Sequence, residues 1–452
     1  MVSYAHAAVV TRRRFASPLV VMTLLAGSAV AAENVAPPPV AVAARLADDG
    51  ETAKLSFDLS GPVEASAHAM ADPDRIVVDL AEVNFQLDPA VGRPAPKRSD
   101  SIVRAFRFGL FGPGKSRVVI DLARPACVAN VKTTPIARGS APSRLAIELK
   151  RCEASAFASA ARAAAASEAS APASNDEAAT TPASGLPVIV IDPGHGGVDG
   201  GAYGVGGAVE KTIVYDYAVE LERRLEARNR FKVVLTRHGD EFVSLEDRVR
   251  IAREANASLF ISIHADMLGE ADVSGATIYT CSERASDAQA ARIAERENAA
   301  DKAAGIEQKA QAAGVADILF DLKRRETRAY AHIFSRGVVD ELKGAARLNR
   351  NPERSAGFLV LKAPDFPSVL VELGYLSNAQ DVQAMNSPTW RAKTASAMAN
   401  AIDRFFAAAQ SDGETAPKAP DAVAASDKAS AAAAASPGNP GPAGQGAGAR
   451  TP

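Results

Sequence analysis

The stretch that decides the fold is Ile189-Val190-Ile191-Asp192-Pro193-Gly194-His195-Gly196-Gly197-Val198-Asp199-Gly200-Gly201. Its β-branched run predicts a buried strand that ends at the Asp-Pro pair. The glycines that follow let the backbone turn sharply around a histidine. We therefore expect His195 at the carboxyl end of a strand, where open α/β sheets keep their chemistry.

Two later apolar runs also end in a polar side chain, one in His264 and the other in Glu372. These runs are Leu259-Phe260-Ile261-Ser262-Ile263-His264 and Ser368-Val369-Leu370-Val371-Glu372. A further carboxylate, Glu210, opens an amphipathic segment shortly after His195. The set predicts two imidazoles and two carboxylates at one edge of a sheet. Two His and one Glu with an open fourth position are typical of a hydrolytic zinc site, and the second Glu is then free to be the base.

The segments between these runs alternate between helical and extended patterns. Their apolar spacing predicts helices over 209–228, 245–255 and 390–406 and strands over 231–236 and 275–279. Strands that alternate with helices indicate a mostly parallel sheet flanked by helices. We place this α/β catalytic domain at 187–408.

Residues 1–32 have the pattern of an export signal peptide. Three arginines at 12–14 precede an apolar core at 18–26, and a small-x-small cleavage site follows at 29–31. The core is too short for a membrane span, so we expect no transmembrane anchor. The Thr-Arg-Arg-Arg-Phe run at 11–15 favours the twin-arginine route, with an ordinary secretory signal as the alternative. Export predicts a periplasmic location.

Residues 38–151 predict a separate small β-sandwich. Runs with period-two alternation occur at 54–59, 75–80, 117–122 and 144–149, and the second and third share an outline that suggests paired hairpins. Ala, Ser, Pro and Thr dominate 152–186 and 409–452. Such composition buries too little apolar surface to fold, so we predict a disordered linker and a disordered tail.

Composition excludes some functions. The chain of 452 residues is 47% hydrophobic and 23% charged, which allows two or three domains. A formal net charge of -2 provides no basic surface for phosphates, so we expect no nucleic-acid partner. Three cysteines make neither a disulfide scaffold nor a cysteine-based zinc motif. Cys127 and Cys152 are a candidate pair in an oxidising compartment, but the sequence does not reveal their separation in space.

Five motifs in order resemble the zinc-dependent N-acetylmuramoyl-L-alanine amidase family (amidase type 3). They are Asp192-Pro193-Gly194-His195-Gly196-Gly197, Glu210-Lys211, Thr236-Arg237, Ser262-Ile263-His264-Ala265-Asp266 and Val371-Glu372-Leu373-Gly374-Tyr375-Leu376-Ser377-Asn378. The resemblance implies that His195, Glu210 and His264 hold zinc and that Glu372 is the catalytic carboxylate. It also implies a peptidoglycan hydrolase that cuts between the lactyl group of N-acetylmuramic acid and the L-alanine of the stem peptide. Such enzymes act in cell-wall remodelling and daughter-cell separation.

The resemblance extends to residues around the ligands and to the β-domain. One common variant of the family has Asn where Asp266 stands, so Asp266 is a candidate for a contact that supports the ligands. Arg237 is a second candidate for such a contact. It is equally well interpreted as a residue that contacts substrate or one that holds the loop in place. The strand pattern at 38–151 is similar to the amidase N-terminal (AMIN) domain, a cell-wall targeting module.

Residues 282–348 interrupt the predicted sheet with a long helical segment. The segment resembles the regulatory insertion of cell-separation amidases, in which a helix covers the active site and a glutamate occupies the open zinc position. Glu297 is our candidate for that carboxylate, with Glu295 second. A LytM-type activator protein would then pull the helix away. The simpler alternative is a solvated amphipathic helix pair.

Two other functions remain as alternatives at this level. One is a wall-binding protein with a degenerate hydrolase domain. The presence of all four expected site residues counts against it, because a protein that no longer catalyses has no physical need for both metal ligands and a base. The other is a zinc peptidase that cuts within the stem peptide. Mass analysis of digested muropeptides distinguishes them, since an amidase releases intact stem peptides that begin with L-alanine.

Overall fold

The computed structural model describes residues 37–93, 100–136, 142–169, 185–306 and 318–411. The expected signal peptide at 1–32 and residues 412–452 of the expected tail lie outside these ranges. The tail prediction is wrong for 409–411, which extend helix α8 (Pro388–Ser411). Within the described ranges, no helix is long and apolar enough to cross a membrane.

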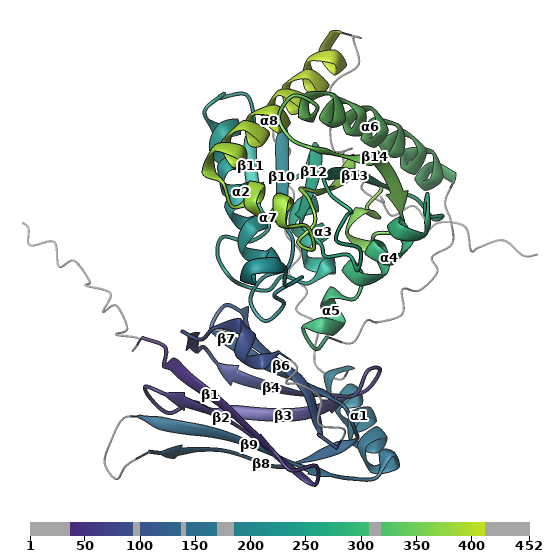
Figure 1. The fold of residues 1–452 in the computed structure, drawn as a ribbon. Coiled ribbons are helices and arrows are strands. Elements are labelled where there is room, and N and C mark those ends of the chain that lie inside the picture. Colours follow the sequence, from purple (N-terminus) through teal and green to yellow (C-terminus); the bar gives the residue numbers. More distant parts are fainter. Residues whose placement is uncertain (1–36, 94–99, 137–141, 170–184, 307–317, 412–452) are drawn as a thin grey trace, which may run out of the picture. The chain divides into compact units, whose positions relative to one another are not determined.

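Two sheets form a β-sandwich between residues 40 and 151, and their strand pairs are antiparallel except for the parallel pair β1 and β5 (Figure 1). One sheet has the order β5-β1-β2-β9-β8 and comprises β1 (Val40–Asp48), β2 (Thr52–Leu59), β5 (Asn84–Phe85), β8 (Ala126–Pro135) and β9 (Ser143–Arg151). The other has the order β3-β4-β7-β6 and comprises β3 (Ala65–Met70), β4 (Arg75–Ala81), β6 (Val103–Gly112) and β7 (Lys115–Leu122). A short 3-10 helix, η1 (Pro89–Gly92), precedes β6. The predicted β-sandwich is confirmed, and β4 and β7 join the two predicted hairpins side by side.

Residues immediately after β9 correct the predicted linker. Helix α1 (Ala154–Ala169) lies inside the range expected to be disordered, and its Phe157 and Ala161 are buried in the core of the sandwich. Alanine is the strongest helix former, and two side chains four residues apart share one face of a helix. The linker prediction is therefore wrong for 154–169, because two apolar residues are enough to dock an alanine-rich helix. Residues 170–184 lie outside the described ranges.

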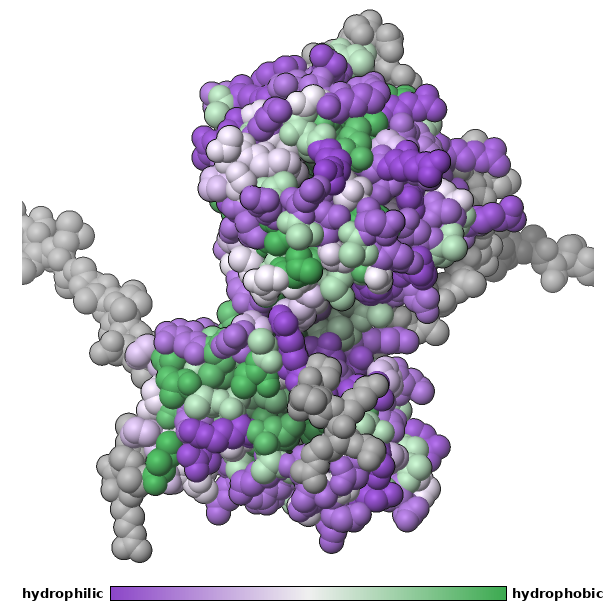
Figure 2. All heavy atoms as spheres, viewed as in Figure 1, coloured by the Kyte–Doolittle hydropathy of each residue, from purple (hydrophilic) through white to green (hydrophobic). Residues whose placement is uncertain are grey.

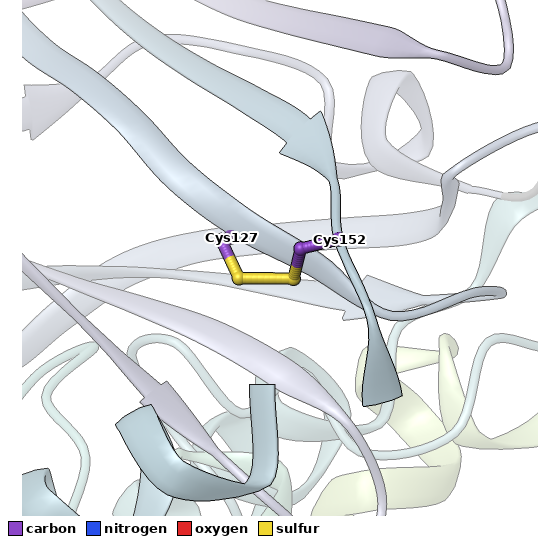
Figure 3. The surroundings of a disulfide bond; sticks show 2 residues. All are labelled: Cys127 and Cys152. Carbon is purple, nitrogen blue, oxygen red and sulfur yellow. A yellow bond between two sulfur atoms is a disulfide. The ribbon is translucent and has the colours of Figure 1, made fainter. Parts of the chain in front are cut away.

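The two cysteines of this domain form a disulfide (Figure 3). Cys127 lies in β8 and Cys152 directly follows β9, and their Cα atoms are 5.8 Å apart. The bond therefore joins the ends of two paired strands. Cys281 is a free, half-buried thiol.

Hydrophobic side chains are exposed on parts of the sandwich. Figure 2 shows hydrophobic and hydrophilic residues mixed on the face of the sandwich that is in view. Val42 and Leu46, both on β1, are 61% and 40% exposed.

A six-stranded, mostly parallel sheet forms the centre of the second domain (Figure 1). Its order is β11-β10-β12-β15-β13-β14, made by β10 (Val188–Pro193), β11 (Lys232–Leu235), β12 (Leu259–His264), β13 (Ala276–Cys281), β14 (Leu348–Ala356) and β15 (Ser368–Glu372). The first four strands of this order run parallel, and β13 pairs antiparallel with β15. The predicted α/β fold is confirmed.

Helices cover both faces of this sheet, so its strands are buried on both sides. Ile189 and Ile191 face one core, with α2 (Glu210–Glu226), α6 (Ile318–Leu342) and α8 (Pro388–Ser411). Val188 and Val190 face the other core, with α3 (Leu245–Glu254) and α4 (Ala288–Glu297). Burial on both faces explains why the strands read as continuous apolar runs. The remaining short elements are η2 (Val205–Gly207), α5 (Ala300–Ala303), η3 (Leu359–Leu361) and α7 (Ala379–Met385).

The predicted insertion at 282–348 divides into two parts with different roles. The C-terminal half of α6 is buried in the same core as α2 and α8, through Phe334, Val338 and Leu342. This half of the helix therefore belongs to the body of the domain. The segment that covers the sheet edge at His195 and His264 consists of α4 and α5. The predicted range was too wide because a helix that packs on a sheet and a helix that covers a site have the same apolar periodicity.

Candidate metal centre

Neighbouring strands bring the predicted side chains to one edge of the sheet. The register of β12 and β15 pairs His264 with Glu372, and β10 pairs with β12 up to Pro193. The amide of Gly194 donates to the carbonyl of Ile263 at 3.0 Å, which holds the His195 loop against β12. Parallel strands end at a common edge, so three chain segments meet here.

His195, Glu210, His264 and Glu297 form a buried cluster at this edge. One potential ligand atom from each residue lies within 4.8 Å of every other. Glu210 Oε2 is 3.2 Å from His195 Nε2, and Glu210 Oε1 is 3.2 Å from His264 Nδ1. Glu297 Oε2 lies 3.4 Å from His195 Nε2 and 3.0 Å from His264 Nδ1. Four donor atoms thus converge on one small volume.

The glycine-rich loop brings the His195 ring close to its neighbours. His195 itself has a φ of +58°, a left-handed conformation that a non-glycine residue adopts at a cost. A side chain at Gly194 would lie 2.3 Å from the His264 ring. A side chain at Gly201, where φ is +66°, would lie 2.6 Å from Glu210 Oε2. The glycines therefore leave room for the cluster.

Backbone amides hold Glu210 in place. Its Oε1 accepts from the Ala265 amide at 2.9 Å, and its Oε2 accepts from the Ala202 amide at 2.8 Å. Glu210 opens α2, where the helix dipole favours a carboxylate. The side chain is 1% exposed, and these backbone contacts fix its orientation.

Asp199 orients His195, a role that the sequence analysis missed. Its Oδ2 lies 2.8 Å from His195 Nδ1, and its Oδ1 accepts from the Gly201 amide. A carboxylate on the far nitrogen of a metal-binding imidazole fixes the tautomer and directs the other nitrogen to the ion. The available signal was an acidic residue four positions after His195 in the same loop.

Two buried arginines hold the His195 loop in place by donating hydrogen bonds to its backbone carbonyls. Arg237 Nε and Nη2 donate to the carbonyls of Pro193 and Gly194 at 3.0 and 3.1 Å. Arg248 donates to the His195 carbonyl at 2.8 Å and to Asp192 Oδ1 at 2.7 Å. Arg237 is thus placed as a brace for the loop. Sequence reasoning did not single out Arg248, because it lies on α3, far along the chain from the motif.

The electrostatics of the cluster favour positive charge at the imidazoles. Burial would lower the pKa of His264, but the carboxylates of Glu297 and Glu210 outweigh burial and raise that pKa to about 10. The pKa of His195 is raised well above its ordinary value by Glu210, Asp199 and Glu297, again against the effect of burial. Burial would raise the pKa of Glu210, yet the two imidazoles hold it well below its usual range.

Glu372 has a different environment, although it is fully buried at the same edge. Its Oε2 accepts from the Asp266 amide at 2.9 Å, while its Oε1 has no hydrogen-bond partner among the described residues. Burial, with the nearby charge of Asp266, raises the pKa of Glu372 well above its ordinary value. A carboxyl with a raised pKa and a free oxygen is suited to accept and return a proton.

Helix α4 closes the site. It places Glu297, 4% exposed, in the cluster and leaves Glu295 exposed to solvent. Arg296 on the same helix donates to Asp266 Oδ1 at 2.5 Å. A cavity of only about 10 Å³ remains beside His195, His264 and Glu297, room for one water molecule at most.

The residues present fit a divalent cation. His195 Nε2 and Glu297 Oε1 are buried without a hydrogen-bond partner in the described part of the chain, which is a cost unless another ligand satisfies them. Two imidazoles and a carboxylate are a donor set that suits zinc. The fold and the site together define a hydrolase of the α/β class with a candidate metal centre beside a proton-transfer carboxyl.

Comparison with known proteins identifies the kind of hydrolase. The sequence profile of N-acetylmuramoyl-L-alanine amidase (Amidase_3) matches residues 189–404, and that of the AMIN domain matches residues 43–149. The chain is 36% identical over 223 residues to N-acetylmuramoyl-L-alanine amidase AmiA of Escherichia coli K12, which covers 49% of this chain and 77% of that protein. It is 29% identical over 419 residues to N-acetylmuramoyl-L-alanine amidase AmiC of Escherichia coli O6:H1, with 90% and 97% covered. Among solved structures, AmiC2 of Nostoc punctiforme is 28% identical, with a TM-score of 0.37 and 50% and 99% of the two chains covered.

The chain belongs to the N-acetylmuramoyl-L-alanine amidase family, and it carries an AMIN domain ahead of the catalytic domain. It is an amide hydrolase of that family, as the order of its motifs predicted.

Proposed function

We propose that this protein is a periplasmic zinc amidase that removes stem peptides from peptidoglycan during daughter-cell separation. The observation that carries the proposal is the pairing of a His195, Glu210 and His264 donor set with the free oxygen of Glu372 at one sheet edge. When bound, zinc supplies a Lewis acid for amide hydrolysis without redox chemistry.

The chain's own residues supply orientation and proton transfer. Asp199 and the backbone amides around Glu210 hold the donor set in place before substrate arrives. Glu372 takes a proton from the attacking water and returns it to the nitrogen of the departing L-alanine. Its raised pKa favours the return step, because a carboxyl that holds its proton is a better acid for the leaving amine.

We further propose that α4 holds the enzyme inactive. Glu297 takes the position that the hydrolytic water needs, and the nearly filled cavity leaves no room for a peptide. A LytM-type activator that binds the open form better would shift the population toward it. Helices α4 and α5 have to move away from the cluster for the site to open.

Location and targeting rest on separate observations. A disulfide between Cys127 and Cys152 is consistent with export to an oxidising compartment, where such bonds persist. The signal-like residues 1–32, with their twin-arginine pattern, provide the route. The AMIN domain is proposed to carry the enzyme to the cell wall.

Muropeptide analysis tests the proposal. Purified full-length protein, with or without zinc and with or without chelator, is incubated with peptidoglycan, and the released fragments are identified by mass. Chelator-sensitive release of intact stem peptides that begin with L-alanine is expected, and it should increase when α4 is released by Glu297→Ala. Fragments cut within the stem would indicate a peptidase instead. Zinc-loaded protein that releases nothing even with Glu297→Ala would indicate a wall-binding module.

A further inference from the structure

We propose that Asp266 and the carbonyl of Met267 form a cation subsite that receives the amino group of the released stem peptide, and that Arg296 fills this subsite in the closed molecule. The inference rests on the proposed amidase function and names a substrate contact within the same site.

The closed structure shows the subsite occupied by a cation from the protein itself. Arg296 Nη1 donates to Asp266 Oδ1 at 2.5 Å and also to the carbonyl oxygen of Met267. Asp266 is 0% exposed, whereas the Arg296 side chain is 49% exposed. The guanidinium therefore reaches inward from solvent to a buried carboxylate, as a bound ligand would.

Asp266 cannot keep this partner when the site opens. Arg296 and Glu297 are adjacent on α4, so a movement that removes Glu297 from the donor set removes Arg296 as well. Oδ2 of Asp266 already has no hydrogen-bond partner in the described ranges. A buried carboxylate that loses its cation partner has to pair again or take up a proton. A cation from substrate or product that reached Asp266 would restore the pairing that Arg296 makes in the closed molecule.

The reaction creates such a cation beside Asp266. The attacking water forms a bond to the carbonyl carbon, the C–N bond breaks, and Glu372 returns the proton to the nitrogen. The freed α-amino group has an ordinary pKa of about 8, so it takes a second proton from solvent at neutral pH. Glu372 accepts from the Asp266 amide at 2.9 Å, so the new ammonium forms next to the subsite.

The subsite distinguishes product from substrate by charge. The scissile amide N–H is a neutral donor, whereas the ammonium of the released peptide makes charge-assisted hydrogen bonds, which are roughly twice as strong. An asparagine at this position keeps the shape and the backbone amide to Glu372 but loses the negative charge. Asp266 is thus assigned as a product-binding residue that favours the late stages of the reaction.

The test compares two probes on an opened enzyme. The reference is full-length, zinc-loaded protein with Glu297→Ala and Arg296→Ala, which removes the contacts of these two side chains with the cluster and with Asp266. Binding of L-alanyl-D-glutamate and of its N-acetylated form is measured by calorimetry, and inhibition of muropeptide hydrolysis by each is measured in parallel. The free amine should bind about tenfold more tightly than the acetylated form, as expected for one charged hydrogen bond.

Asp266→Asn in this background should reduce that preference to about threefold or less, while zinc content and the unfolding midpoint stay the same. Equal binding of both peptides to the reference overturns the inference without any Asp266 variant. A preference that survives Asp266→Asn overturns it as well. A reference protein that binds zinc but releases no stem peptides contradicts the proposed function instead, so the two failures are distinguishable.

Discussion

Buried carboxylates around the candidate metal centre differ in what their oxygens contact. Both oxygens of Glu210 accept backbone amides and face imidazoles. Burial would raise the pKa of Glu210, but the two imidazoles hold it well below the usual range. Glu372 has one oxygen without a hydrogen-bond partner in the described part of the chain, and burial together with the nearby charge of Asp266 raises its pKa. The same side chain is thus stabilised in its charged form at one position and in its protonated form at the other, because the environment sets which form is stable.

Glu372→Gln should abolish most amidase activity. The amide can still accept the bond from Asp266, but it cannot take a proton from water, so kcat should fall by about 10²- to 10⁴-fold. Zinc content should remain at the level of the unmodified protein. Glu226→Gln, an exposed change on α2, is the matched control and should leave kcat unchanged. Full activity of Glu372→Gln would remove it from the reaction.

Asp199→Asn should weaken zinc binding without unfolding the domain. The variant replaces the carboxylate that lies 2.8 Å from His195 Nδ1, so the imidazole loses both its orientation and part of its basicity. Loss of such a partner typically costs about 10- to 100-fold in metal affinity or activity. Competition with a chromogenic chelator measures the affinity. An unchanged affinity would show that His195 is oriented by its loop alone.

At the scale of elements, helices α4 and α1 each place one or two side chains in a buried environment. On α4, the direction of the helix places Glu297 inward and Glu295 outward, since residues two apart on a helix point about 200° apart. On α1, Phe157 and Ala161 anchor a helix of low polarity to the β-sandwich. Composition alone indicates a disordered linker for the residues of α1, and it leaves a solvated helix pair as the alternative for the residues of α4 and α5.

Glu297→Ala in the full-length protein should raise basal amidase activity by about tenfold or more, since loss of roughly 1.4 kcal/mol of closing energy changes the open fraction tenfold. The measurement is release of soluble fragments from labelled peptidoglycan without activator. Glu295→Ala is the matched control on the same helix and should have no effect. If both variants have the same basal activity, the Glu297 carboxylate does not hold α4 over the site.

Phe157→Ala should destabilise the β-sandwich by about 3–5 kcal/mol, the usual cost of removing a buried aromatic ring. The free energy of unfolding of the β-sandwich transition in the full chain is measured in urea. Arg162→Ala, exposed on the same helix, should change it by less than about 0.5 kcal/mol. If both variants change the free energy of unfolding equally, the packing of α1 does not stabilise the β-sandwich.

At the scale of the whole molecule, two folded domains are stabilised by different means. The catalytic domain buries both faces of its sheet under helices, whereas the sandwich adds a disulfide between the ends of β8 and β9 to its core. The catalytic domain contains one half-buried free thiol, Cys281. Reducing conditions should therefore affect the domains unequally.

Replacing Cys127 and Cys152 by Ser should destabilise the sandwich by about 3 kcal/mol, as expected for a bond that closes a loop of 25 residues. Calorimetry of the full chain should show a lower midpoint for the sandwich transition and an unchanged one for the catalytic domain. Hydrolysis of soluble muropeptides should stay the same. A shift of both transitions would indicate that the domains unfold as one unit.

Local patterns were sufficient to predict much of this protein. Apolar runs that end in His264 and Glu372 were recognisable as strands, because burial on both faces of a sheet leaves no polar position to interrupt them. The glycines around His195 marked a loop that brings the backbone close to other groups. Family motifs in the correct order then identified the reaction.

Only the tertiary structure decided the contacts between distant segments. The pairing of Cys127 with Cys152, the docking of α1, the division of the insertion at α6 and the meeting of Arg296 with Asp266 all depend on distances that chain order does not contain. Periodicity reports which face of an element is buried, but not what it is buried against. The sequence by itself determined the strands, the donor set and the chemical class, while packing decided which side chains complete and close the site.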